Sequence, residues 1–220
     1  MPFPLTHMCV AWRILEKNPL PQKEAAQFML GAISPDAIHY RAEYQGAEMK
    51  NIGPAKKTTH LCPVSEEKWG QVTDNVGWEK IIRDFSRAHR GDPFAQGYAS
   101  HTLTDLHNNS TLWKTFITNH PTEAAKGYAS DYYKDLKAID TRLYFEYPAT
   151  AQIMQLLSYA TPEEIPTLVT KQETHAIQQN ILHTHFANAT PAKNHTYLFT
   201  TYENTLDFIE SATKLCFTLI

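Results

Sequence analysis

Residues 92–109 read DPFAQGYASHTLTDLHNN and predict a helix that begins at Pro93 and ends at Asn108 or Asn109. Asp92 belongs to the residue types that cap helix N-termini, and proline is favoured at the first helical position because its missing N–H needs no partner there. Apolar side chains recur along the segment at helical spacing, at Phe94, Tyr98, Leu103 and Leu106. We therefore expect one long helix here.

Within this expected helix, His101 and Asp105 stand four residues apart. That spacing places both side chains on one face about one turn apart, which allows an imidazole and a carboxylate to grip one metal ion. The same pattern is also typical of a surface pair or of a hydrogen-bonded core histidine. His7, Asp36 and His60, at separate places in the chain, strengthen the metal hypothesis.

Helical periodicity also appears on both sides of this segment. We expect helices over residues 6–16, 21–31, 75–89, 111–118, 122–145, 149–159, 162–187 and 196–219. Residues 40–71 show little periodicity and contain several glycines and prolines, which predicts a long loop after the second helix. The sequence thus predicts an all-α fold, a multi-helix bundle in which residues 1–220 form one domain, with Asp36 just beyond the end of the second helix.

The composition excludes some classes of function. The chain has 220 residues, of which 42% are hydrophobic, and can bury a sizeable core without disulfides. Eight glycines are few for this length, which favours helices over sheets. A formal net charge of -3 provides no broad basic surface, so nucleic-acid binding through bulk charge is disfavoured. Eleven histidines are the compositional outlier, and histidine is the usual neutral nitrogen ligand of metals.

The three cysteines, Cys9, Cys62 and Cys216, are odd in number and include no C-x-x-C pair, so they predict neither a disulfide framework nor a zinc ribbon. The N-terminus lacks the basic and apolar regions of a secretory signal, and no apolar stretch approaches the ~18 residues that a transmembrane helix needs. We expect a cytoplasmic protein in a reducing compartment. The sequence does not indicate its oligomeric state.

Four short motifs in the first 110 residues resemble the zinc-dependent phospholipase C-like family, which is related to the S1/P1 nucleases. The motifs are PLTH (4–7), LGAISPD (30–36), TH (59–60) and GYASHTLTD (97–105), and they follow the order of the family. The resemblance implies an all-α fold and a cluster of two or three zinc ions that hydrolyses phosphate esters. The second half of the chain carries helical patterns but none of these motifs.

By this resemblance, the ligands of one zinc ion would be Asp36, His60, His101 and Asp105, and His7 with a bridging Asp105 would be part of a second. Two metals about 3.5–4 Å apart can clamp the attacking and leaving oxygens of a phosphoryl displacement. Asp36 could instead orient or deprotonate the attacking water as a catalytic base. Mn, Fe and Ni also suit these ligands. We expect a small-molecule or lipid phosphate ester as substrate.

The chain departs from the family pattern in two places. Secreted members use a mature N-terminal amine as a metal ligand, whereas this chain opens with Met1-Pro2-Phe3. Members also carry a histidine about six residues after the helix aspartate, where Thr111 stands here, and a later His-x-x-x-Glu, which this sequence lacks. A full three-zinc cluster is therefore not expected. Two alternatives remain: a non-catalytic helical metal-binding or scaffold protein, and an HD-domain-like phosphohydrolase, which the lack of a His-Asp dipeptide weakens.

Other residues are weaker candidates for the site. His39, Cys62 and His107 lie close in sequence to the proposed ligands, but each is equally well explained as a solvated histidine or a small core residue. The stretch GYASH (97–101) is echoed as GYASD at 127–131, which makes additional acidic ligands possible on the expected helix 122–145. These would be Asp131, Asp135 and Asp140. A chance echo and exposed carboxylates are the commoner explanation.

Overall fold

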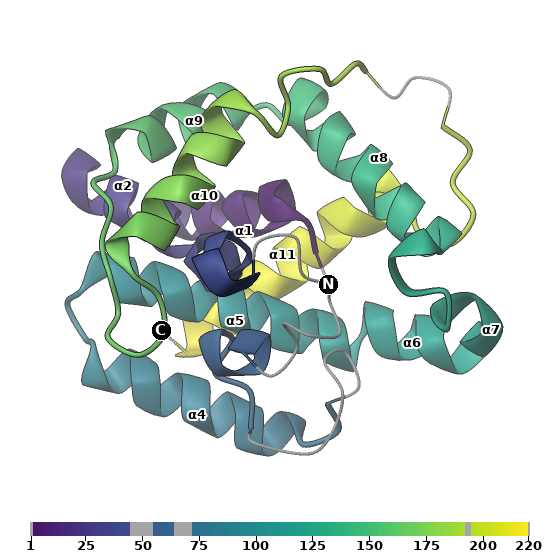
Figure 1. Cartoon of the computed structure of the whole chain (residues 1–220), viewed down its shortest axis with the longest axis horizontal. Helices are drawn as coiled ribbons and strands as arrows, with labels where there is room; N and C mark the ends of the chain where they lie inside the picture. Colours follow the sequence, from purple (N-terminus) through teal and green to yellow (C-terminus); the bar gives the residue numbers. More distant parts are fainter. Residues whose placement is uncertain (1, 45–54, 64–71, 192–194, 220) are drawn as a thin grey trace.

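A computed structural model of the protein describes residues 2–44, 55–63, 72–191 and 195–219, and helices dominate these ranges (Figure 1). The α-helices are α1 (Pro4–Lys17), α2 (Gln22–Gly31), α4 (Asn75–Ala88), α5 (Pro93–Ser110), α6 (Leu112–Asn119), α7 (Pro121–Ala124), α8 (Asp131–Glu146), α9 (Thr150–Tyr159), α10 (Lys171–His183) and α11 (Tyr202–Leu219). Three 3-10 helices are η1 (Ser34–Tyr40), η2 (Ala42–Tyr44) and η3 (Gly127–Ala129), and residues 55–59 are also helical. No strand occurs within the described ranges, so the all-α prediction is confirmed.

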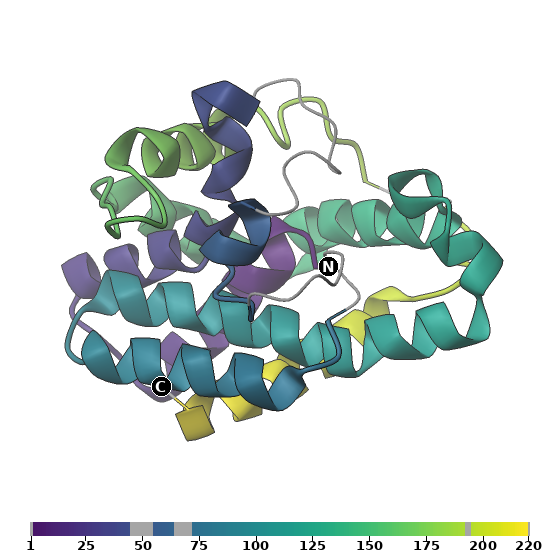
Figure 2. The ribbon, with the colours of Figure 1, turned by 60° about the horizontal axis from the view of Figure 1, so that its bottom comes forward.

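Helix α5 is the central element of the bundle. It contacts α1, α2, α4, α6 and α11, and Figure 2 shows it lying alongside α4. The Asp92 carboxylate accepts a hydrogen bond from the Ala95 N–H, and Pro93 occupies the first turn, as the sequence predicts. Phe94, Tyr98 and Leu103 are essentially inaccessible to solvent. Because α5 is covered on most sides, its polar residues His101 and Asp105 are buried with the apolar ones.

Two glycines allow α2 and α5 to approach closely. A Cβ atom on Gly31 would overlap the Phe94 carbonyl oxygen, and one on Gly97 would overlap the Phe28 carbonyl oxygen. Glycine is required where two backbones come this near. The close crossing brings the carbonyl of Ala32, just after α2, next to α5, where it contacts a site residue.

The single helix expected over residues 122–145 is wrong. The chain forms α7, then η3, and begins α8 only at Asp131. Gly127 adopts a positive φ of 56°, which interrupts the helix, and the Ser130 hydroxyl caps α8 by accepting from the Tyr133 N–H. The echo of residues 97–101 at 127–131 is therefore not a structural repeat, because the first copy lies inside α5 and the second in a helix break.

The helix expected over residues 162–187 is also wrong over its first part. Residues 161–170 are not helical, and Ile165 forms an isolated antiparallel bridge with Val169. Helix α10 begins after Thr170, whose hydroxyl accepts from the Glu173 N–H while the Glu173 carboxylate accepts from the Thr170 N–H. This capping box sets the start of α10 more strongly than the apolar periodicity does. In the expected loop 40–71, residues 42–44 and 55–59 are helical, and residues 45–54 and 64–71 lie outside the described ranges.

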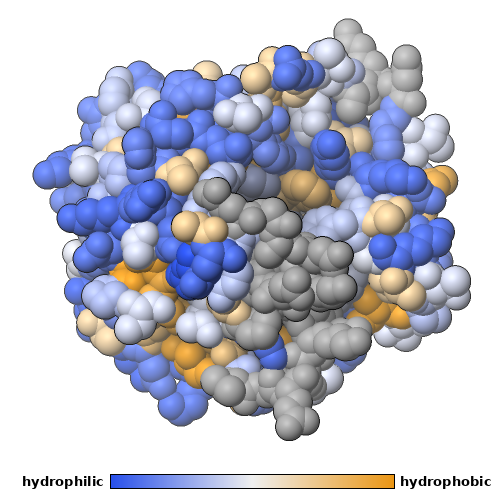
Figure 3. All heavy atoms as spheres, in the orientation of Figure 1, coloured by the Kyte–Doolittle hydropathy of each residue, from blue (hydrophilic) through white to orange (hydrophobic). Residues whose placement is uncertain are grey.

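The surface in Figure 3 is largely hydrophilic, with apolar side chains visible in separate small areas. Among the described residues, no helix combines the length and apolar character that crossing a lipid bilayer requires. The three cysteines are buried and form no disulfide. Burial raises the pKa of the Cys9 and Cys216 thiols, which keeps them in the protonated form.

Candidate metal centre

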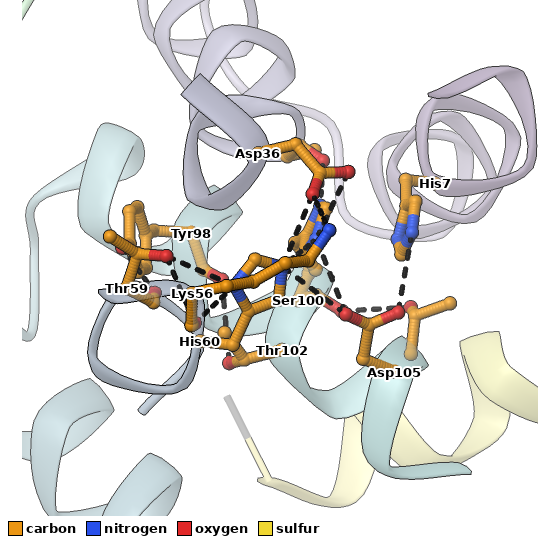
Figure 4. A network of polar contacts seen from close by, with 12 residues as sticks. His7, Asp36, Lys56, Thr59, His60, Tyr98, Ser100, Thr102 and Asp105 are labelled. Carbon is orange, nitrogen blue, oxygen red and sulfur yellow. Dashed lines mark hydrogen bonds and ion pairs between the residues drawn. The ribbon is translucent and has the colours of Figure 1, made fainter. Parts of the chain in front are cut away.

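Five polar side chains from four separate segments meet against α5 (Figure 4). His101 and Asp105 project from α5, His7 from α1 and Asp36 from η1, and His60 follows the helical residues 55–59. The three histidines and Asp105 are at most 2% exposed, while the Asp36 side chain is 21% exposed. These are the five residues that the sequence analysis selects, and the structure brings all of them together.

His60 lies at the middle of the first group of contacts. Its Nε2 atom is 3.3 Å from His101 Nε2 and 3.4 Å from Asp36 Oδ1. The same atom is 3.4 Å from Asp105 Oδ2. His101 Nε2 lies 3.6 Å from Asp105 Oδ2 and 4.0 Å from Asp36 Oδ2. Two imidazole nitrogens and two carboxylates thus face one another across a few ångströms.

Backbone carbonyls fix which nitrogen of each ring faces this centre. His101 Nδ1 is 2.8 Å from the Ala32 carbonyl oxygen, and His60 Nδ1 is 2.8 Å from the Lys56 carbonyl oxygen. A carbonyl only accepts, so Nδ1 carries the proton in both rings and donates it. In a neutral ring the Nε2 lone pair then points at the carboxylates. Metal-ligating histidines are oriented in this way by a partner on their other nitrogen.

The centre therefore brings together groups that all accept hydrogen bonds. Two Nε2 lone pairs 3.3 Å apart repel each other, and the carboxylates beside them add negative charge. Such a set is stabilised by a cation, or by a proton, between its members. In tetrahedral zinc sites with bonds of about 2.0–2.1 Å, ligand atoms lie about 3.3–3.4 Å apart. The separations around His60 match that value.

A second group shares two residues with the first. His7, His101 and Asp105 offer ligand atoms that lie within 4.8 Å of one another, as do Asp36, His60 and His101. The His7 and His101 rings stack with centroids 3.7 Å apart, and His7 Nε2 is 3.5 Å from Asp105 Oδ1. His7 Nδ1 and Asp105 Oδ1 are buried and have no hydrogen-bond partner among the described residues. Buried polar atoms without partners are costly, which makes this second group a further candidate position for a cation.

The charges of the cluster shift the pKa values of its members. Burial and then the nearby His101 lower the pKa of His7 to about 3, so His7 is neutral near pH 7. Burial alone would lower the pKa of His101, but Asp105 outweighs it and raises that pKa. Burial would also raise the pKa of Asp105, but His101 and the other imidazoles keep it below its usual value. Without a metal ion, the cluster thus draws a proton onto His101.

Lys56 is a member of the site that the sequence analysis missed. Its side chain is 4% exposed, and Nζ donates to Asp36 Oδ1 at 2.6 Å and to His39 Nε2 at 3.2 Å. Burial would raise the pKa of Asp36, but Lys56 and then His60 hold it well below the usual value. Lysine is normally a surface residue, so the residue type alone did not indicate that Lys56 belongs to the site. Its place one helical turn before His60 was the available hint, because its carbonyl also orients the His60 ring.

A pocket of about 210 Å³ leads to the exposed side of the site. Asp36, His39 and Lys56 form its polar end. Asn180 and His185 also line the pocket, and its other lining side chains are aromatic or apolar, among them Phe3, Tyr40, Tyr128, Tyr133, Ile177 and Ile181. The site is therefore reachable from solvent on the side of Asp36.

The other candidate ligands lie elsewhere. His107 bonds Ser211 and stacks on Phe208. Asp131 pairs with Lys134 at the surface, and Cys62 is buried in the hydrophobic core. Asp135 and Asp140 are buried, but they hold His195 and His185 and backbone N–H groups. His39 is the exception, because it contacts Lys56 and lies 3.8 Å from Asp36.

The arrangement can hold one divalent cation, and the second group offers a position for another. Imidazole and carboxylate ligands suit zinc and also Mn, Fe and Ni, so the geometry does not select one metal. Comparisons of the chain with protein-family models, curated proteins and solved structures found no match.

Proposed function

We propose that the protein is a metal-dependent hydrolase of phosphate esters, with zinc as its metal. The observation that carries the proposal is the pair of Nε2 atoms of His60 and His101, fixed by backbone carbonyls so that they face Asp36 and Asp105. The motifs that resemble the zinc-dependent phospholipase C-like family provide independent support. They select the same five residues from the sequence alone.

In this proposal, Asp36, His60, His101 and Asp105 would hold the first metal ion. His7 and Asp105 would hold the second, so that the two ions would share Asp105. The unpartnered Oδ1 of Asp105 and the 3.5 Å approach of His7 Nε2 to it support the bridging role. The described residues form two candidate ligand groups and no third one, so we propose one or two ions.

A divalent cation would supply Lewis-acid chemistry. It would polarise the phosphoryl group and lower the pKa of water, which makes a strong nucleophile available near neutral pH. Asp36 lies at the junction of the metal ligands and the pocket, where an attacking water would enter. Its carboxylate is ionised because of Lys56, and Oδ2 is the oxygen away from that ammonium. We propose that Oδ2 orients the attacking water and accepts its proton as the water oxygen bonds to phosphorus. The P–O bond to the alcohol breaks, and the proton then passes from Asp36 to the departing alkoxide. His60 and His101 keep their Nδ1 protons, which are bonded to backbone carbonyls.

A hydrolysis screen tests this proposal. We expect the zinc-loaded protein to cleave p-nitrophenyl phosphate, bis-p-nitrophenyl phosphate or a phosphocholine lipid, to lose that activity with a chelator and to regain it with zinc. His101→Ala should abolish the activity, whereas His107→Ala, on the same helix but outside both ligand groups, should retain it. A zinc-loaded protein that is inactive on all three classes would contradict the hydrolase proposal.

One observation favours a second candidate, a non-catalytic metal-binding or scaffold protein of the same fold. Lys56 already gives Asp36 a buried cation, so part of the negative charge is neutralised by the chain itself. If the site is purely structural, His101→Ala should lower the melting temperature of the zinc-loaded protein, and no phosphate ester should be turned over.

A further inference from the structure

We propose that Lys56 binds a non-bridging phosphate oxygen and thereby makes the site selective for phosphate monoesters of small aromatic or apolar alcohols. This inference rests on the proposed function and names its substrate class. It starts from the position of Lys56, whose ammonium group lies where the polar end of the pocket meets Asp36.

The surroundings of Lys56 hold its ammonium group in place. Asp36 Oδ1 at 2.6 Å and His39 Nε2 at 3.2 Å both accept from Nζ, and the side chain is only 4% exposed. The ion pair with Asp36 keeps the ammonium group charged although it is buried. A charge in a partly dry site interacts more strongly with an anion than a surface lysine does. A phosphate that reaches Asp36 through the pocket must therefore meet Lys56.

The charge of the site sets the preference for a dianion. Lys56 cancels the charge of Asp36, and the three imidazoles are neutral when they act as ligands. One divalent cation then leaves a net positive charge after Asp105 is counted, whereas without Lys56 the same site would be neutral. A monoester carries up to two negative charges near neutral pH and a diester only one. Lys56 thus favours the monoester.

The walls of the pocket indicate the alcohol part of the ester. Tyr40, Tyr128 and Tyr133 line it together with apolar side chains, and Asn180 and His185 are its polar residues away from Asp36. Aromatic walls favour flat apolar groups through area burial and ring contacts. The volume of about 210 Å³ is below the range of about 300–1,000 Å³ typical of drug-sized ligands, so a small organic group fits better than a second large ester arm.

The test is a calorimetric titration of the zinc-loaded protein with inorganic phosphate, with no turnover involved. Compared at equal zinc content, Lys56→Met should bind phosphate at least tenfold more weakly than the unchanged protein. Lys57→Met is the matched control, because Lys57 neighbours Lys56 but does not line the pocket, and its phosphate affinity should equal that of the unchanged protein. Unchanged phosphate binding in a folded, zinc-loaded Lys56→Met variant would overturn the proposal.

A second measurement needs no change at Lys56. The unchanged protein should bind phenyl phosphate at least tenfold more tightly than diphenyl phosphate, and equal or reversed affinities would overturn the monoester selectivity. Tyr128→Ala should weaken phenyl phosphate severalfold and leave inorganic phosphate unaffected, because Tyr128 lines the apolar part of the pocket. Tyr159→Ala is the control, since Tyr159 is similarly exposed and lies outside the pocket. Tight binding only of phosphate at the end of a polymer or lipid would overturn the small-alcohol assignment.

A failure of the proposed function can be distinguished from a failure of the Lys56 proposal. If the protein binds no zinc, the hydrolase proposal fails, and the phosphate titration is then made on the metal-free protein. Loss of phosphate binding in Lys56→Met but not in Lys57→Met would still support an anion site at Lys56. Equal binding by both variants would overturn it.

Discussion

The residues that the structure describes include two sets of paired histidines and aspartates, and the sets differ in how their hydrogen bonds are satisfied. At the candidate metal centre, the Nδ1 atoms of His60 and His101 donate to carbonyls, and their Nε2 atoms face Asp36 and Asp105. The second set, which we call the α8 clamp, consists of Asp135 with His195 and Asp140 with His185.

In the α8 clamp, every carboxylate has donors. Asp135 Oδ2 accepts from the backbone N–H groups of Leu198, Phe199 and Thr200, and Oδ1 accepts from His195 Nε2 at 2.8 Å. Asp140 accepts from His185 Nε2 and from the Leu5 N–H, both at 2.9 Å. The clamp ties the segment after α10, and the start of α1, to α8.

The same residue types thus serve two purposes. In the α8 clamp, histidine Nε2 donates to a carboxylate, and the pair is complete without a ligand. In the candidate metal centre, Nε2 faces carboxylates as an acceptor, and the set needs a positive charge from outside. The direction of the second ring nitrogen, and not the presence of His and Asp, distinguishes a ligand site from a structural contact.

Asp105→Asn should have the largest effect on this contrast. Asp105 faces His7, His60 and His101, so loss of its charge should weaken zinc binding about a thousandfold, or about 4 kcal/mol. Competition with a chromophoric chelator measures this change. Asp135→Asn is the matched control, because it changes the same group in the α8 clamp, and zinc affinity should not change. Equal losses in both variants would remove the distinction between the two regions.

Stability in the absence of metal should respond in the opposite order. Asp135→Asn leaves backbone N–H groups and His195 without their charged acceptor, and we expect the free energy of unfolding to fall by roughly 2–3 kcal/mol. Asp105→Asn removes the attraction between Asp105 and a protonated His101 but leaves no backbone N–H without its acceptor, so the metal-free protein should lose clearly less stability than Asp135→Asn does. Urea denaturation with a chelator present makes the comparison. A large destabilisation by Asp105→Asn would show that the candidate centre is an ordinary structural network.

Acidification should destabilise the metal-free protein in part through His7. Its pKa is about 3 in the folded state and 6.5 in the reference state, so the unfolded chain binds the proton first. This contribution to stability is complete above pH 6.5 and is lost progressively as the pH falls toward 3. We expect His7→Gln to reduce the loss between pH 6.5 and 5.5 by up to about 1.4 kcal/mol. Urea denaturation at the two pH values measures it, and identical pH dependence in both proteins would contradict the assignment.

The sequence predicted the parts of the fold that depend on strong local signals. The Asp92-Pro93 start and the apolar spacing of α5 were sufficient for that helix. The breaks at Gly127 and before Thr170 were missed because a positive φ and a capping box overrode the helical periodicity. Such local features involve only a few residues, so they hardly change the apolar periodicity of a long segment, and a prediction from that periodicity does not detect them.

The five proposed ligands of the candidate site were predictable from the sequence, but the orientation of their rings and the presence of Lys56 were not. The i, i+4 spacing selects His101 and Asp105, and the motifs that resemble the family select His7, Asp36 and His60. The orientation of His101 depends on the Ala32 carbonyl, which reaches α5 only through the close α2–α5 crossing. Lys56 depends likewise on a tertiary contact with Asp36. No short-range sequence pattern encodes either contact.

The most direct test of the account is the metal content of the protein and the position of the metal. After incubation with zinc and gel filtration, we expect one or two zinc ions per chain, with an anomalous-scattering peak bonded to Nε2 of both His60 and His101. A protein that retains no zinc, and whose crystals show these two nitrogens bridged by a proton or a water molecule alone, would contradict the central claim that this cluster is built to hold a metal ion.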